Sequence, residues 1–421
     1  MNATYRPKLL PVALLTAACL ASLSPAFAAG EYEQPGTMKA SALLPADTLK
    51  GPNHRVQEEV QNDGFLNIYV IETNSGPLKA VSTAQAKQYA AEVEAAARMQ
   101  QLQDSDQFAS GMEAAAGSVV TGTSALLNDP AGALSGAVTG VGAMFGRAQE
   151  AIASGGAKGA GEDSAMANLA GYSKTKREYA YEFGVDVYSR NPVLQKQLDA
   201  VAKAGFAGNI AAKAALMMVP GGAGVALSVT SSTATLNEAF RDLPPVELRK
   251  RNREKLAAMG VNADIAELYI ENGVFTPREQ TLIVEALSGM AGTENRGAFI
   301  RHAVLTDNAD LAYFRQRQAG MYAGYHRSVE PLARFVSVGK VAVGQKKDGT
   351  IVFCAPLDHL YWTPAIGAFV ELFEADLLAV PEVKGKELWL GGTLSEMARK
   401  ELEARGWSVK EGSEGQLLAS G

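Results

Sequence analysis

Residues 130–147 read PAGALSGAVTGVGAMFGR, a glycine-rich run that carries no charge before its last residue. The glycines recur with four-residue spacing, which places them near one face of an α-helix and lets a second helix approach very closely. Each glycine costs a helix about 1 kcal/mol relative to alanine, so we expect tight helix packing that offsets this cost. The predicted helix-contact residues are Gly132, Gly136, Gly140 and Gly146, with Gly142 beginning an overlapping pair.

The segment before this stretch also reads as a helix. Residues 114–128 form a second uncharged run, and Asp129 followed by Pro130 is typical of a helix start, so residues 111–153 are expected to form a hairpin of two helices. Each run falls short of the about 20 strongly apolar residues needed to cross a bilayer. We therefore expect the hairpin to pack inside the protein's own helical bundle, with peripheral membrane contact or self-association as the alternative.

Strand patterns occur near both ends of the chain. Residues 64–81 carry aromatic and β-branched side chains around the turn Asn74-Ser75-Gly76, which predicts a β-hairpin. Residues 335–343 and 351–355 predict a second hairpin across Lys347-Asp348-Gly349, followed by alternating helix and strand. The predicted fold class is mainly α: a helical bundle with small-residue (Gly/Ala) helices, an N-terminal β-hairpin and a small mixed α/β C-terminal region.

Local signals and shifts in composition divide the chain into regions. Asn191-Pro192 and Thr276-Pro277 are further helix starts, and Glu279 is placed to complete a capping box with Thr276. The expected regions are a signal peptide (1–28), a flexible lead-in (29–63), a β-hairpin plus helix (64–107), a Gly/Ala-rich helical region (108–241), an amphipathic helical region (242–334) and the mixed α/β C-terminal region (335–421).

The first thirty residues are typical of a bacterial export signal. Arg6 and Lys8 precede an uncharged apolar run over residues 9–23, and small residues before the Ala28–Ala29 bond suit signal peptidase. The sequence therefore predicts a periplasmic or secreted protein. The alternative is a lipid-anchored protein that begins at Cys19, which follows small residues as in lipoprotein signals.

Composition narrows the function further. The formal net charge of the full chain is −6, and it becomes −8 when Arg6 and Lys8 are removed, so the sequence argues against nucleic-acid binding. Removal of the signal leaves Cys354 as the one cysteine, which excludes an intrachain disulfide. Its apolar neighbours predict a buried core thiol.

Few residues suggest chemistry. Adjacent cations at Arg249, Lys250, Arg251 and Arg253 could contact an anionic surface, although a solvated helix face is the simpler interpretation. His359 and Asp358, with His326, form a weak candidate for a hydrolase; the structural alternative is that His359 hydrogen-bonds a backbone carbonyl. Zinc-ligand spacing, a nucleophile elbow and a phosphate-binding loop are missing from the sequence, so we expect no metal and no cofactor.

These observations favour a non-enzymatic role. The predicted function is that of an exported bacterial envelope protein acting through helix-mediated contact with itself, a partner protein or the membrane surface. Two alternatives remain: a secreted hydrolase centred on His359 and Asp358, and a membrane-perturbing effector that uses the hairpin at 111–153.

Overall fold

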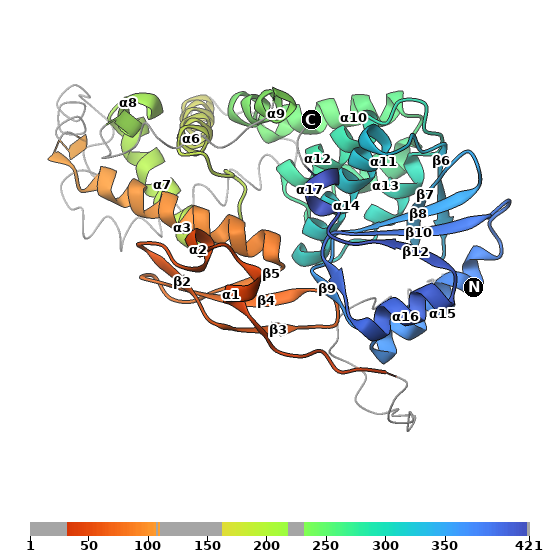
Figure 1. The fold of residues 1–421 in the computed structure, drawn as a ribbon. Helices are drawn as coiled ribbons and strands as arrows, with labels where there is room; N and C mark the ends of the chain where they lie inside the picture. The colour runs from red at the N-terminus through yellow and green to blue at the C-terminus, as the bar shows by residue number, and fades with distance from the viewer. Residues whose placement is uncertain (1–31, 107, 110–161, 218–230, 419–421) are drawn as a thin grey trace, which may run out of the picture.

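The structure is a computed structural model that describes residues 32–106, 108–109, 162–217 and 231–418. Two five-stranded sheets lie in these residues, one near each end of the chain, and helices pack against each of them (Figure 1). A third, two-stranded sheet pairs β9 (His359–Leu360) with β11 (Thr393–Leu394).

The N-terminal sheet is antiparallel and is built around β4 (Asn67–Thr73). One edge of β4 pairs with β3 (Glu59–Asn62) and β2 (His54–Val56), and β1 (Met38–Lys39) extends β3; the other edge pairs with β5 (Leu78–Val81). Two short helices, α1 (Ala40–Leu43) and α2 (Ala46–Leu49), lie between β1 and β2.

Helix α3 (Thr83–Gln103) follows β5 directly and packs its apolar side chains against this sheet. Tyr69 and Ile71 of β4 are fully buried against Ala86 and Val93 of the helix. The predicted hairpin at 64–81 is thus confirmed, and the helix expected after it begins at the N-cap Ser82 and ends at Gln103.

The C-terminal sheet has the strand order β12-β10-β8-β7-β6. The three strands that come first in the chain, β6, β7 and β8, form an antiparallel meander, and β10 and β12 run parallel to β8. The strands are β6 (Arg334–Val338), β7 (Val341–Gln345), β8 (Thr350–Ala355), β10 (Gly385–Leu390) and β12 (Trp407–Lys410). The hairpin predicted across Lys347-Asp348-Gly349 joins β7 to β8 and is confirmed, whereas residues 335–343 form two strands rather than one.

Successive side chains of β8 lie on opposite faces of the sheet, so they pack into two separate hydrophobic cores. Ile351 and Ala355 face α15 (Pro364–Leu377) and α16 (Glu396–Ala404), while Val352 and Cys354 face the helices of the central region. The buried free thiol of Cys354 agrees with the prediction from its neighbours. The C-terminal turn α17 (Glu414–Leu417) packs on this second core.

The central region is helical. Its members are α6 (Glu162–Glu182), α7 (Pro192–Ala207), α8 (Ala212–Met217), α9 (Ser231–Asp242), α10 (Pro245–Ala258), α11 (Ala263–Ile270), α12 (Pro277–Ser288), α13 (Gly297–Ala303) and α14 (Ala309–Ser328). The caps predicted at Asn191 and Thr276 are present, and Thr276 with Glu279 forms a complete capping box. The helix that begins at Pro192 ends at Ala207, and Asn209 then adopts a positive φ of 50°.

The predicted fold class is wrong. Of the residues that the structure describes, 53% are in helices and 17% in strands, and they form three sheets, so this is not a mainly helical bundle with a small mixed C-terminal region. Residues 38–62, expected as part of a flexible lead-in, supply three strands of the N-terminal sheet. These strands are two to four residues long, too short for an alternating pattern to stand out in the sequence.

Some predictions fall on residues outside the described ranges. These are the helix hairpin at 111–153, its contact residues Gly132, Gly136, Gly140 and Gly146, and the export signal with the Ala28–Ala29 bond and Cys19. Among the helices that the structure describes, none has the length and apolar character to span a membrane.

Candidate ligand-binding cavity

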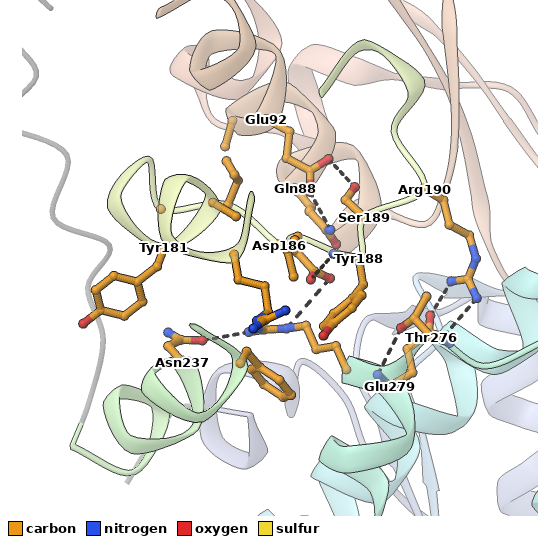
Figure 2. A pocket seen from close by; sticks show the side chains of 18 of the residues that line it. Gln88, Glu92, Tyr181, Asp186, Tyr188, Ser189, Arg190, Asn237, Thr276 and Glu279 are labelled. Atoms are coloured by element: carbon orange, nitrogen blue, oxygen red, sulfur yellow. Dashed lines mark hydrogen bonds and ion pairs between the residues drawn. The ribbon is translucent and has the colours of Figure 1, made fainter. Parts of the chain in front are cut away.

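A cavity of about 730 Å³ lies where four helices meet the loop that joins α6 to α7. Helices α3, α6, α9 and α12 contribute most of its walls, and Leu216 of α8 with Tyr313 and Gln316 of α14 adds the rest. Figure 2 shows side chains from these separate segments gathered around one space. The volume falls within the range of about 300–1,000 Å³ that is usual for small-molecule sites.

The loop over residues 183–191 brings polar groups into the cavity wall. Helix α6 ends at Glu182, and Gly184 follows with a φ of +68°, a conformation that glycine adopts without steric cost. The backbone N–H of Tyr188 donates to Asp186 Oδ1 at 2.9 Å, and Asn191 then caps α7. These local contacts hold Asp186, Tyr188 and Ser189 at the cavity.

Glu92 of α3 is a buried carboxyl group in this wall, with 3% of its surface exposed. Gln88 Nε2 donates to it at 2.8 Å and Ser189 Oγ at 2.7 Å. Burial raises the pKa of Glu92 to about 7, because removal of water penalises the charged form more than these hydrogen bonds stabilise it. Ser189 Oγ also accepts the N–H of Asn191 at 3.1 Å, so the serine ties the loop to α3.

A tight ion pair closes another side of the cavity. Arg190 donates to both carboxylate oxygens of Glu279, at 2.5 and 2.9 Å, and to the carbonyl oxygen of Val274 at 2.6 Å. Glu279 is also the third residue of α12, where it completes the capping box with Thr276. The pair therefore links the loop to α12 and satisfies both charges (Figure 2).

Arg177 and Arg278 are paired less completely. Arg177 is 6% exposed, and its one hydrogen bond among the described residues runs from Nε to the carbonyl oxygen of Arg241, at 3.1 Å. Arg278 donates from Nη2 to Asn237 Oδ1 at 3.1 Å, while its Nε lies 3.9 Å from Asp186 Oδ2. Burial lowers the pKa of Arg177 and raises that of Asp186.

The Tyr188 hydroxyl is the least satisfied polar group of the wall. Its oxygen is buried, and no residue of the described chain hydrogen-bonds to it. Burial raises the pKa of Tyr188 to about 12, while the nearby positive charges of Arg177 and Arg278 act to lower it. The tyrosine hydroxyl and both guanidinium groups therefore lie in one part of the cavity.

The residues of the hydrolase hypothesis occupy other parts of the molecule. Asp358 accepts the backbone N–H groups of Asn67 and Thr83, which ties the N-terminal sheet and the first turn of α3 to the C-terminal region. His359 Nδ1 contacts Thr393 Oγ1 at 2.6 Å, a side-chain partner in place of the backbone carbonyl that we expected.

His326, the third of these residues, has other partners. Its Nδ1 accepts the N–H of Leu332 at 3.1 Å and lies 3.2 Å from Thr293 Oγ1. Within the residues that the structure describes, no hydrogen bond or ion pair joins His326, Asp358 and His359 to one another. The structure thus gives each of the three a separate structural contact.

The predicted basic cluster lies on α10. Arg253 pairs with Glu267 and Glu271, so an anionic surface would have to compete with this protein's own carboxylates for it. Arg249, Lys250 and Arg251 form no ion pair with a described residue; Arg249 is half-buried, and Lys250 and Arg251 are exposed. The described part of the chain contains no group of three or more side chains able to hold a metal ion.

The cavity residues were not among the sequence predictions. Glu92, Arg177, Tyr188 and Arg278 are far apart in the chain and belong to no motif, so no local pattern marks them. The nearest signals were the cap at Asn191 and the capping box of Glu279, which both lie beside the cavity. Comparison of the whole chain with protein-family models, with curated proteins and with solved structures gives no match.

Proposed function

We propose that this chain is an exported binding protein that holds a small molecule in the cavity between α3, α6, α9 and α12. The observation that carries the proposal is the cavity itself: about 730 Å³, bounded by residues of six helices and of the loop that joins α6 to α7. Sites of this size usually bind one small ligand, with a few placed polar groups that orient it. The export part of the proposal rests on the charged start, apolar run and Ala28–Ala29 bond of residues 1–30.

Binding is favoured over catalysis by how the polar groups are used. Ser189 and Glu92 resemble a nucleophile and a base, since Ser189 Oγ lies 2.7 Å from Glu92 Oε2 and burial raises the pKa of Glu92 to about 7. The serine oxygen is already occupied by the N–H of Asn191, and Gln88 occupies the other oxygen of Glu92. Both groups therefore act in fixing the loop to α3.

The test is to purify the mature protein from the periplasm and to look for a bound molecule by native mass spectrometry. Thermal unfolding with benzoate, inorganic phosphate and glucose as added probes provides a second measurement. A ligand present at 100 times its dissociation constant stabilises a protein by about 2.7 kcal/mol, which gives a readily measured shift of the unfolding midpoint.

A blocking variant localises the site. Ala91 is exposed on α3 and lines the cavity, so Ala91→Trp places an indole at the opening without disturbing the core. Lys87, one turn earlier, is exposed and does not line the cavity, which makes Lys87→Trp the matched control. We expect the bound mass and the midpoint shift to disappear in Ala91→Trp alone. The proposal fails if the wild type carries no bound mass and responds to no probe, or if Ala91→Trp behaves as the control does.

A further inference from the structure

The charges around the cavity are unevenly paired. Arg190 and Glu279 form two hydrogen bonds to each other, and Arg241 forms two with Asp242, at 2.7 and 2.9 Å. The carboxyl group of Glu92 is engaged by Gln88 and Ser189. These contacts account for two of the four arginines that line the cavity and leave Arg177 and Arg278.

Arg177 has no carboxylate within ion-pair distance among the described residues. Glu178 and Asp242 act on it only at longer range, and Asp242 is already bound by Arg241. The side chain is nevertheless more than nine-tenths buried. A buried cation without a counter-charge costs a folded protein several kcal/mol, so buried arginines normally have an anionic partner.

Arg278 has partners for only part of its guanidinium group, and the Tyr188 hydroxyl has none among the described residues. Arg278 donates to Asn237 Oδ1, while its Nε lies 3.9 Å from Asp186 Oδ2, a loose ion pair that is longer than a hydrogen bond; the other oxygen of Asp186 accepts the N–H of Tyr188. The Tyr188 hydroxyl is a desolvated donor with no partner in the part of the chain that is described. Arg177, Arg278 and the Tyr188 hydroxyl thus bring more N–H and O–H donors to one region than the carboxyl group of Asp186 accepts there.

We propose that the ligand of this cavity is an organic carboxylate, whose two oxygens accept hydrogen bonds from Arg177, Tyr188 and Arg278. This inference rests on the proposed function, since it identifies the class of molecule that the cavity holds. A guanidinium group presents paired donors that match the two oxygens of a carboxylate, which favours this class over a neutral ligand. Tyr181 and Phe240, whose rings lie 4.5 and 4.6 Å from the guanidinium carbons of Arg241 and Arg278, supply apolar wall for the body of the ligand.

The experiment compares benzoate with benzamide, which has the same shape and no charge, and with inorganic phosphate. Thermal unfolding and titration calorimetry on the mature protein provide the measurements. We expect benzoate to raise the unfolding midpoint and benzamide to leave it unchanged. Arg177→Gln should weaken benzoate binding by about tenfold or more, because a hydrogen bond to a charged group contributes about 1.5–3 kcal/mol. Tyr188→Phe, which removes only the hydroxyl, should weaken it by a smaller factor and guards against misfolding of the arginine variant.

Arg253→Gln is the control, because Arg253 lies on α10, does not line the cavity and pairs with exposed carboxylates. Equal responses to benzoate and benzamide, a response to phosphate alone, or unchanged benzoate binding in Arg177→Gln would each overturn the inference while the binding function stands. If no probe binds, the bound mass decides: an organic acid supports the inference and a neutral molecule overturns it. The absence of both a bound mass and a probe response would refute the proposed function itself.

Discussion

Gly324 lies in the last two turns of α14, where the C-terminal turn α17 lies directly on the helix backbone. A Cβ atom at this position would come within 2.6 Å of the carbonyl carbon and 2.8 Å of the Cα of Leu417. Leu417 is 1% exposed, and an ion pair of 2.6 Å between Arg317 and Glu414 holds the same turn against α14. Because these atoms are backbone, the turn as a whole has to move if Gly324 is replaced by alanine.

The magnitude follows from two opposing effects. Alanine in a helix interior is about 1 kcal/mol more stable than glycine. Overpacking costs about 1–3 kcal/mol, and exposure of Leu417 would cost about 1.5–3 kcal/mol if the turn detached. We therefore expect Gly324→Ala to lower the free energy of unfolding by about 1–2 kcal/mol.

The same substitution one turn earlier is the control. A Cβ on Gly320 would lie 2.9 Å from Leu418 Cδ2, the far end of a flexible side chain that can rotate away. Gly320→Ala should therefore be neutral or stabilising by up to about 1 kcal/mol. Urea unfolding and hydrogen exchange of residues 414–418 measure both variants. If Gly324→Ala is as stable as Gly320→Ala and keeps the exchange protection of α17, then α17 does not pack against the backbone at Gly324 as described.

Three further predictions concern buried polar contacts. The raised pKa of Glu92, about 7 against 4.5, means that its contribution to stability is present below about pH 4.5 and is lost as the pH rises through 7. Between pH 5 and 8 the wild type should thus lose up to about 3 kcal/mol relative to Glu92→Gln, and parallel urea midpoints for the two proteins across this range would contradict it. Asp358→Ala should lower the free energy of unfolding by about 1–3 kcal/mol, because it leaves the backbone N–H groups of Asn67 and Thr83 without an acceptor. Asp358→Asn keeps one side-chain oxygen and should lower it by less. Equal losses of stability in calorimetry would argue against the contact. Glu33→Ala removes the acceptor for the N–H of Trp362 and for the hydroxyl of Ser395. Limited proteolysis should therefore cut the chain near residue 33 faster in this variant than in the control Glu58→Ala. Equal cleavage rates would show that this contact does not hold the chain near residue 33 in place.

Local signals in the sequence located several of the helix starts. Asn191, Thr276 and Thr363 each accept backbone N–H groups from the turn that follows, and a proline occupies the next position in all three cases. A cap and its helix are adjacent in the chain, so the sequence contains all the residues involved. The same holds for the turns at residues 74–76 and 347–349, which join neighbouring antiparallel strands.

The sheets were harder to predict because their strands are short and their partners are distant. β1 has two residues and pairs with β3 about twenty residues later, so its hydrophobic alternation cannot be recognised. Asp358 was singled out for chemistry, yet it binds Asn67 and Thr83, which lie more than 270 residues earlier. Only the folded chain shows that its role is to join the two ends of the protein.

The buried cysteine, the helix caps and the tight turns could be predicted from the sequence, because each depends on composition or on residues a few positions apart. The pairing of strands in the two five-stranded sheets and the residues that line the cavity are fixed only when distant segments pack together. Glu92, Arg177, Tyr188 and Arg278 come from three helices and a loop, and they form one wall only after α3, α6 and α12 pack together. Burial then decides their properties, since water is removed from the carboxyl group of Glu92 and the guanidinium group of Arg177 only in the folded protein.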